Sequence, residues 1–209
     1  MELLLITPPR TKENELSLVQ HFLERGLHKL HIRKPAYGTG DYERYIKAIP
    51  ASFHHRLVIH GAFELVNSFP STGVHLRSDD RQNTALLQSV QQLKPASLST
   101  SFHGWQEIME NTTPYDYVFI SPVFDSISKQ GYKAAIDLGG HRQLCEWAIR
   151  HKKQLPRIAG LGGVSAATLL QLYENGFEGA ALLGAIWESA DPIAAFNTLQ
   201  QANDNPAGA

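Results

Sequence analysis

The 209-residue chain has one cysteine, two methionines and no apolar run as long as a membrane span. A single cysteine cannot form an internal disulfide framework, which favours a reducing compartment, so we expect a cytoplasmic protein. A spanning helix needs about 20 consecutive apolar residues. The N-terminus, residues 1–7, has too short an apolar run and no basic leader, so it does not read as a secretory signal. The sequence therefore predicts neither a membrane protein nor a disulfide-rich secreted domain.

The chain also lacks an excess of either charge. The sequence has 19 Lys and Arg residues and 20 Asp and Glu residues, which gives a net charge of −1. Without a basic field, nucleic acid and anionic membranes are not expected partners. A homo-oligomer stays open.

What the sequence has is a regular alternation of short apolar runs and helical patterns. Eight strands are predicted at 2–7, 29–34, 56–61, 72–77, 96–100, 117–123, 157–162 and 179–184. Eight helices are predicted at 14–25, 39–48, 62–68, 83–93, 104–111, 138–152, 165–175 and 191–202. Such alternation is typical of a parallel sheet with right-handed crossovers, and eight units predict an α/β protein with a (β/α)8 TIM barrel. An open doubly wound sheet is the alternative. We expect one barrel domain over 1–202 and a flexible tail over 203–209.

Polar side chains gather where the predicted strands end, which is where barrels carry their active sites. They are His31 and Arg33, His60, His75 and Arg77 with Asp79 and Asp80, His103, Ser126 and Ser128 with Lys129, Gly162 and Gly163, and Gly184 with Ala185. Alternation along a strand places His31 and Arg33 on one face. Each residue alone could be structural, but the conjunction favours an enzyme site for a phosphorylated small molecule.

Glycines follow the seventh and eighth predicted strands, where many barrels bind phosphate through backbone amides and a helix N-terminus. Gly162, Gly163 and Gly184 would let the backbone approach a ligand closely. Ser126, Ser128 and Lys129 would add two hydroxyls and a cation after the sixth strand.

Two metal sites can be weighed from the sequence. Four strand-end histidines, including His103, could gather, but they come from different strands and form no H-x-H or H-x-x-x-H pair. Spacing therefore gives this cluster no support. Asp79 and Asp80 could instead hold Mg²⁺ through oxygen.

The order of these motifs resembles the thiamine phosphate synthase family, which also includes the thiazole tautomerases. The resemblance covers nearly the whole chain. It is carried by the segments 30–33, 73–76 with Asp79 and Asp80, 121–129, 159–164 and 179–186. It implies a barrel enzyme of thiamine biosynthesis that joins an aminopyrimidine diphosphate to thiazole phosphate and releases diphosphate.

The resemblance also implies roles for single residues. Arg33 is similar to the arginine that meets the pyrimidine diphosphate, and Asp80 to a Mg²⁺-binding aspartate. Gly163 corresponds to the glycine whose amide holds the thiazole phosphate. Also implied are contacts to phosphate or thiazole from Ser126, Ser128, Lys129, Gly184 and Ala185. Substrate contacts from His31, His60 and His75 are expected from their place at the predicted strand ends. His103 lies where the tautomerases carry a histidine for proton transfer.

Three positions depart from the family pattern. Pro35 stands where synthases carry a lysine after the second strand, Gly61 where they carry a Mg²⁺-binding aspartate, and Gly184 where a serine is usual. Two other functions therefore stay open. The first is a tautomerase that needs no metal and uses His103 as its base. The second is a non-catalytic binder of thiazole or thiamine phosphates. A different phosphate-binding barrel, such as a sugar phosphate isomerase, would need an acidic base at a strand end, and none is obvious.

Overall fold

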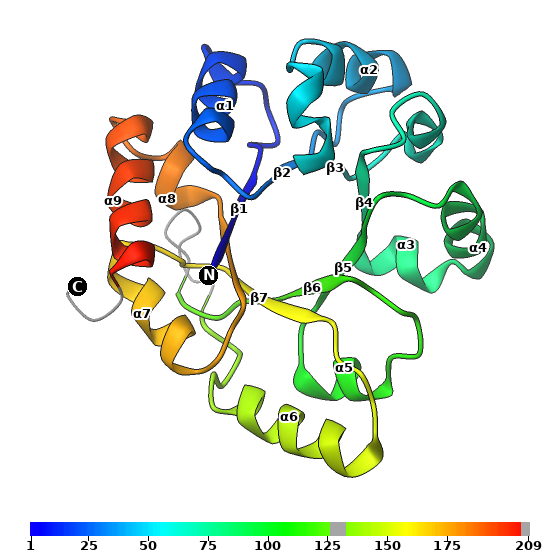
Figure 1. Cartoon of the computed structure of the whole chain (residues 1–209), viewed down its shortest axis with the longest axis vertical. Helices are drawn as coiled ribbons and strands as arrows, with labels where there is room; N and C mark the ends of the chain where they lie inside the picture. The colour runs from blue at the N-terminus through cyan, green and yellow to red at the C-terminus, as the bar shows by residue number, and fades with distance from the viewer. Residues whose placement is uncertain (126–132, 206–209) are drawn as a thin grey trace. The chain divides into compact units, whose positions relative to one another are not determined.

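In the computed structural model, eight parallel strands form a closed barrel in sequence order (Figure 1). The predicted TIM barrel is thus confirmed, and the open sheet is excluded. The strands are β1 (Glu2–Ile6), β2 (Lys29–Ile32), β3 (Leu57–Ile59), β4 (Gly73–Leu76), β5 (Leu98–Phe102), β6 (Tyr117–Ile120), β7 (Arg157–Leu161) and β8 (Gly179–Leu182). The structure describes residues 1–125 and 133–205, so Ser126, Ser128 and Lys129 lie outside the described residues.

Helices follow the strands in the predicted order. They are α1 (Glu15–Glu24), α2 (Thr39–Lys47), η2 (Phe63–Asn67, a 3-10 helix), α4 (Thr84–Leu93), α5 (Trp105–Glu110), α6 (Gly140–His151), α7 (Ala166–Glu174) and α9 (Pro192–Asp204). Three short helices were not predicted: η1 (Ala51–Arg56, 3-10), α3 (Ser78–Gln82) and α8 (Gly184–Trp187). Within the described ranges, no helix is long and apolar enough to cross a membrane.

The chain divides into two compact units, of which one is Leu4–Thr100. Its strand register decides which side chains share a face. His31 pairs with Val58, Val58 with Gly73, and His75 with Ser99. Because side chains alternate along a strand, His60 shares the face of Val58 and lies beside His75. Three histidines from three neighbouring strands are thereby brought to one face.

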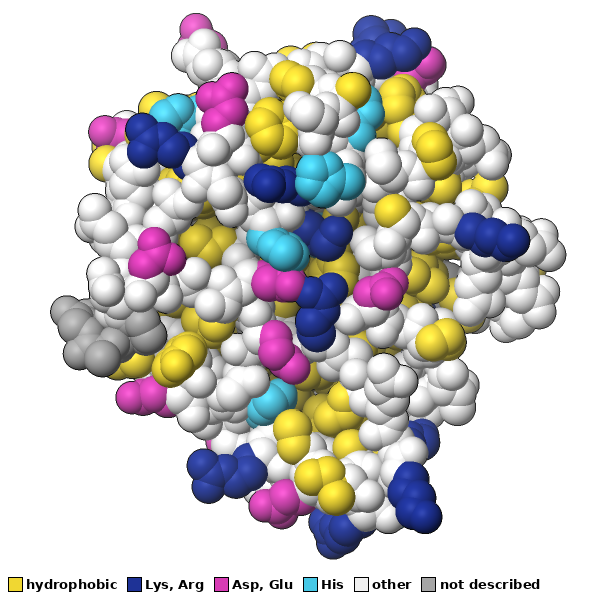
Figure 2. Space-filling view, viewed as in Figure 1, with side chains coloured by type: hydrophobic (Ala, Val, Ile, Leu, Met, Phe, Trp, Pro, Cys, Tyr) yellow, Lys and Arg dark blue, Asp and Glu magenta, His cyan; other side chains and the backbone are white. Residues whose placement is uncertain are grey.

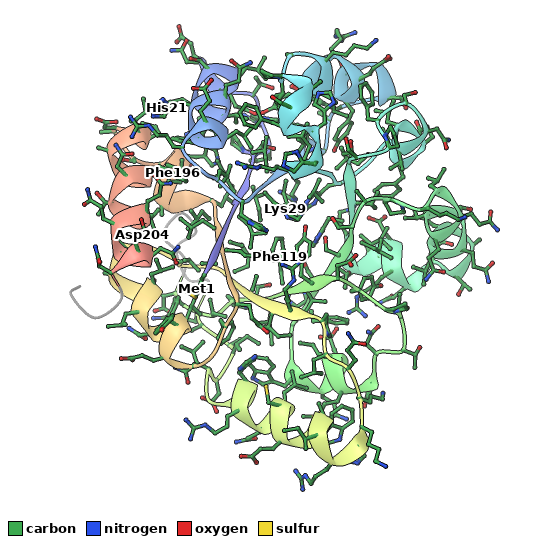
Figure 3. The ribbon with its side chains drawn as sticks, viewed as in Figure 1. Met1, His21, Lys29, Phe119, Phe196 and Asp204 are labelled. Carbon is green, nitrogen blue, oxygen red and sulfur yellow. The ribbon has the colours of Figure 1, made fainter. Side chains whose placement is uncertain are left out.

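The second unit comprises Met1–Leu3 and the chain from Ser101 onward. Here β6 pairs with β7 and β7 with β8, and α9 packs against α7 and α8. The fully buried Phe196 anchors α9 (Figure 3). Asp191 caps this helix by accepting hydrogen bonds from the amides of Ile193 and Ala194. The helix runs to Asp204, and Asn203 bonds both the amino group and the carbonyl of Met1. Acidic and basic side chains are intermixed on the face of the molecule shown in Figure 2.

Candidate functional site

A small cavity of about 160 Å³ lies beyond the carboxyl ends of β2, β3 and β4. We call it the basic pocket. It is lined by Arg33, Lys34, Pro35, Tyr37, Tyr42, His60, Gly61 and Arg77. Arg33 is half-buried, and no carboxylate in the described part of the chain pairs with its guanidinium. An uncompensated guanidinium in a concave site favours an anionic ligand.

Arg77 forms an ion pair with Asp80 on the exposed rim of the basic pocket. Its Nε donates to Oδ2 at 2.8 Å, a terminal nitrogen donates to Oδ1 at 3.1 Å, and its backbone amide also donates to Oδ2. Burial alone would raise the pKa of the Asp80 carboxyl, but the Arg77 hydrogen bonds outweigh it and lower that pKa. Asp80 therefore pairs with Arg77 and completes the capping box at the start of α3, where its carboxylate accepts from the Arg77 amide.

The residues present do not fit a Mg²⁺ site built from protein carboxylates. Both oxygens of Asp80 are held by Arg77, and Asp79 is exposed. At Gly61, a Cβ atom would lie 3.4 Å from the ring of Tyr42, so this tyrosine fills the space beside the position of the missing aspartate.

His31, His60 and His75 form a compact group at the base of the basic pocket, and we call it the histidine cluster. All three side chains are buried, and His60 also lines the pocket. His31 Nδ1 lies 2.9 Å from His60 Nε2, and the rings of His60 and His75 stack with centroids 4.3 Å apart. Burial lowers the pKa of each imidazole, that of His75 to about 3. The cluster is therefore neutral at physiological pH.

Neutral buried histidines make the protein sensitive to acid. Below about pH 6.5 the unfolded chain takes up protons that the folded cluster does not, so the free energy of unfolding falls as the pH falls. With a folded pKa of about 3, His75 alone should account for a loss of about 2 kcal/mol at pH 5. Urea unfolding in the presence of a chelator, measured from pH 8 to pH 5, checks this. The loss should be smaller in His75→Gln and unchanged in His55→Gln, whose side chain is exposed. Equal losses in all three proteins would contradict it.

A buried ion pair lies behind the basic pocket, and the sequence did not point to it. Lys34 Nζ lies 2.7 Å from Glu15 Oε2, and the two side chains are 0% and 1% exposed. Lys34 also donates to the carbonyl of Pro8, and Tyr45 donates to the other oxygen of Glu15. Burial lowers the pKa of Lys34 although Glu15 opposes the shift.

In the second unit, His103 directly follows β5 and its side chain is exposed. Its Nδ1 lies 3.0 Å from the carbonyl oxygen of Ser121. A carbonyl can only accept, so Nδ1 carries the proton and Nε2 of the neutral ring keeps its lone pair. The backbone amide of His103 donates to Glu107. His103 is thus an oriented imidazole with an available basic nitrogen.

Gly162 and Gly163 follow β7 with φ values of +102° and +65°. A Cβ atom on Gly163 would lie 2.2 Å from the carbonyl oxygen of Asp125, so only glycine fits against this backbone. Gly184 and Ala185 begin α8 after the neighbouring strand β8. No residue in 1–125 or 133–205 accepts a hydrogen bond from the amides of Gly163, Gly184 or Ala185.

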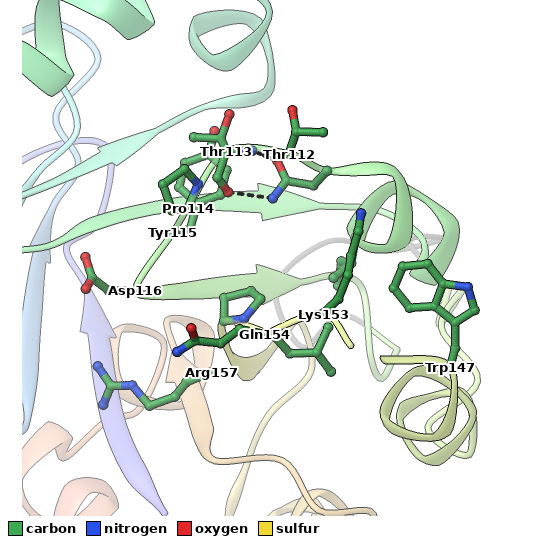
Figure 4. A pocket seen from close by; sticks show the side chains of 13 residues that line it. Thr112, Thr113, Pro114, Tyr115, Asp116, Trp147, Lys153, Gln154 and Arg157 are labelled. Atoms are coloured by element: carbon green, nitrogen blue, oxygen red, sulfur yellow. Dashed lines mark hydrogen bonds between the residues drawn. The ribbon is translucent and has the colours of Figure 1, made fainter. Parts of the chain in front are cut away.

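A larger cavity of about 690 Å³ lies by the amino-terminal ends of β6 and β7 (Figure 4). Its lining includes Thr113, Trp147, Lys153 and Arg157. None of the site residues predicted from the sequence lines it. Size alone therefore does not identify the functional site, and the strand-end residues remain the better candidates.

Comparison with known proteins agrees with this arrangement. The thiamine-phosphate synthase of Latilactobacillus sakei is 25% identical over 201 residues, which cover 91% of this chain and 85% of the relative. That of Desulfitobacterium hafniense is 26% identical over 185 residues, or 87% of this chain and 86% of the relative. The crystal structure of thiamine phosphate pyrophosphorylase from Bacteroides thetaiotaomicron has a TM-score of 0.73 at 27% identity, covering 98% of both chains.

A solved structure with lower identity shows the same fold. Thiamine phosphate pyrophosphorylase from Pyrococcus furiosus has a TM-score of 0.79 at 18% identity, covering 99% of this chain and 97% of that one. The family profile described as thiamine monophosphate synthase matches residues 3–186, most of the chain. With the barrel and its strand-end residues in place, this match shows that the chain belongs to the thiamine monophosphate synthase family.

Proposed function

We propose that this protein is a transferase that joins an aminopyrimidine diphosphate to thiazole phosphate and releases diphosphate. The observation that carries the proposal is the basic pocket, in which Arg33 has no carboxylate partner in the described chain. Membership of the family supports the same reaction.

In this reaction the bond between the pyrimidine methylene carbon and the diphosphate oxygen breaks, and diphosphate leaves with the electron pair. The thiazole nitrogen then uses its lone pair to form the new carbon–nitrogen bond. Negative charge builds up on the leaving oxygens as the first bond breaks. Arg33 lies in the pocket proposed for this group, with Arg77 at its rim. Fixed guanidinium groups stabilise such charge more strongly in the transition state than in the ground state.

The thiazole phosphate is proposed to bind at the ends of β7 and β8. Amides of Gly163, Gly184 and Ala185 are the donors, and the positive φ of Gly163 supports a role in close backbone approach. Contacts from Ser126, Ser128 and Lys129 remain part of the proposal on the sequence resemblance alone. Magnesium has no step in it, because Asp80 is held by Arg77 and position 61 is glycine.

A second candidate function rests on His103. A tautomerase needs a base that removes a proton from one atom of the thiazole ring system. The same group can then return the proton to another atom of that ring system. His103 has its Nδ1 proton held by the Ser121 carbonyl, which leaves Nε2 as the base. This geometry supports thiazole tautomerisation as the alternative to the transfer reaction.

A paired assay separates the two functions. The purified protein is given aminopyrimidine diphosphate plus thiazole phosphate in one reaction and the unaromatised thiazole carboxylate phosphate in another. Thiamine phosphate and diphosphate in equal amounts from the first reaction would support the transferase. Turnover only in the second would replace it with the tautomerase. Binding of thiazole phosphate without either product would favour the non-catalytic binder.

Gly163→Ala should impair both stability and phosphate binding. A left-handed φ at a non-glycine residue costs about 1–3 kcal/mol, and overpacking against the Asp125 backbone adds a similar amount. We expect the free energy of unfolding to fall by about 2–6 kcal/mol and thiazole phosphate affinity to drop, as measured by urea unfolding and calorimetry. Gly104→Ala is the control, since a Cβ atom there meets nothing within 4 Å. Wild-type affinity in a folded Gly163→Ala variant would exclude this phosphate site.

A further inference from the structure

The histidine cluster is built from three neighbouring strands, and its arrangement follows from the strand register. His60 follows Ile59, which pairs with Val74, so His60 lies beside His75. His31 pairs with Val58, two residues before His60 on the same face. One ring nitrogen from each histidine lies within 4.8 Å of the others. Three imidazoles therefore converge on one small volume.

The hydrogen bond between His75 and Ser99 decides which nitrogen of His75 would bind a ligand. Ser99 Oγ donates its proton to the carbonyl of Val74, and His75 Nδ1 lies 2.9 Å from the same hydroxyl. In the tautomer with the proton on Nδ1, His75 donates to this hydroxyl, and Nε2 is the nitrogen that can bind a metal. This is the outer-shell arrangement that orients metal-binding histidines in proteins.

The remaining nitrogens of the cluster are not all satisfied by the protein. His31 Nδ1 and His60 Nε2 share one hydrogen bond. His60 Nδ1 is buried and has no hydrogen-bond partner among the residues described. A buried polar atom left unpaired costs about 1–3 kcal/mol. An additional ligand that binds imidazole nitrogen would remove this cost.

We propose that His31, His60 and His75 together bind one divalent transition-metal ion of the Zn²⁺ class. Imidazole suits Zn²⁺ and its neighbours, whereas Mg²⁺ prefers oxygen ligands. Tetrahedral Zn²⁺ with Zn–N bonds of about 2.0–2.1 Å needs nitrogens roughly 3.3 Å apart. The ring nitrogens of the cluster lie within 4.8 Å of one another and would move closer to reach that spacing. Neutral imidazoles, which the burial of all three side chains favours, are the form that coordinates metal.

Three histidine ligands leave one coordination position open. His60 belongs to both the cluster and the basic pocket, so this position faces the pocket. Arg33 and Arg77 there oppose a bare cation, so a water-derived hydroxide or a phosphate oxygen is the favoured fourth ligand. Diphosphate should therefore strengthen metal binding. The metal site itself does not depend on the proposed transfer reaction.

The test is metal titration of the full chain after treatment with a chelator and its removal. Calorimetry with Zn²⁺ should give one ion per chain, and Co²⁺ should show the visible absorption of a four-coordinate site. His60→Gln and His75→Gln should each bind Zn²⁺ at least about 100-fold more weakly, and Ser99→Ala about 10–100-fold more weakly. His55→Gln, an exposed histidine of η1 in the same unit, should bind as the wild type does.

Absence of stoichiometric Zn²⁺ binding by the wild type would overturn the proposal. So would wild-type affinity in His60→Gln and His75→Gln, or an equal loss in His55→Gln. Circular dichroism reports whether each variant folds. If the two ligand variants do not fold, the Co²⁺ spectrum of the wild type and the Ser99→Ala affinity decide the question. The paired assay for the transfer reaction is read separately, so failure of one proposal is distinguishable from failure of the other.

Discussion

Arg33→Ala is expected to lower turnover in the transfer reaction by about 10²–10³-fold, the usual effect of removing one preorganised donor to a developing anion. Arg33 follows β2, is half-buried in the basic pocket and has no carboxylate partner in the chain as described. Its charge is therefore available to the leaving diphosphate. The measurement is the rate of diphosphate release at saturating substrates. Because the interaction strengthens as the bond breaks, kcat should fall more than KM rises.

Two variants control this result. Arg44→Ala removes an arginine of α2 whose side chain is 77% exposed and pairs with Asp41, so turnover should not change. Arg33→Lys keeps the charge but loses the planar pair of donors, so it should restore only part of the rate. A wild-type kcat in Arg33→Ala would contradict the proposed role of the basic pocket in the reaction.

Glu15→Ala is expected to lower the free energy of unfolding by about 3–5 kcal/mol, because it leaves the buried Lys34 ammonium without its counter-ion. Glu15 is 1% exposed, and it accepts hydrogen bonds from both Lys34 and Tyr45. Burial, and after it the neighbouring Glu15 carboxylate, raises the pKa of Tyr45, so this phenol stays protonated as a donor. Urea unfolding at pH 7 measures the effect.

An exposed pair in the same unit provides the matched control. Glu43 and Lys47 are 2.7 Å apart on α2, with side chains 40% and 63% exposed. Glu43→Ala should change stability by at most about 0.5 kcal/mol. The double variant Glu15→Gln with Lys34→Met removes both charges and should recover much of the loss. Equal effects of Glu15→Ala and Glu43→Ala would contradict the assignment of a buried ion pair.

Most of the fold could be predicted from the sequence, because most strands are short apolar runs bounded by polar or glycine residues. The starts of β1, β2, β6, β7 and β8 match the predicted ranges to the residue. The helices that were missed are too short to show a helical period of apolar residues. Helix α3 is five polar residues, Ser78–Gln82, stabilised by the Asp80 cap, and α8 is a single turn after β8. Such short helices depend on local caps and tertiary contacts more than on periodicity.

The histidine cluster was not expected from the sequence, because His31, His60 and His75 lie on three different strands and their spacing in the chain shows no metal-binding pair. The structure places them in contact because the register of β2, β3 and β4 brings them to one face. The sequence pattern could not show that the Arg77 guanidinium donates hydrogen bonds to the carboxylate of Asp80. This contact depends on the backbone turn between β4 and α3. Similarly, Tyr42 beside Gly61 and Glu15 beside Lys34 join residues far apart in the sequence. Only the folded chain brings such pairs together.

The position of diphosphate in a crystal of the product complex tests the central claim most directly. Crystals grown with thiamine phosphate and diphosphate should show the diphosphate in the basic pocket, with oxygens within hydrogen-bond distance of Arg33. Diphosphate bound elsewhere, or an empty basic pocket while thiamine phosphate is bound, would contradict the assignment of this pocket to the leaving group.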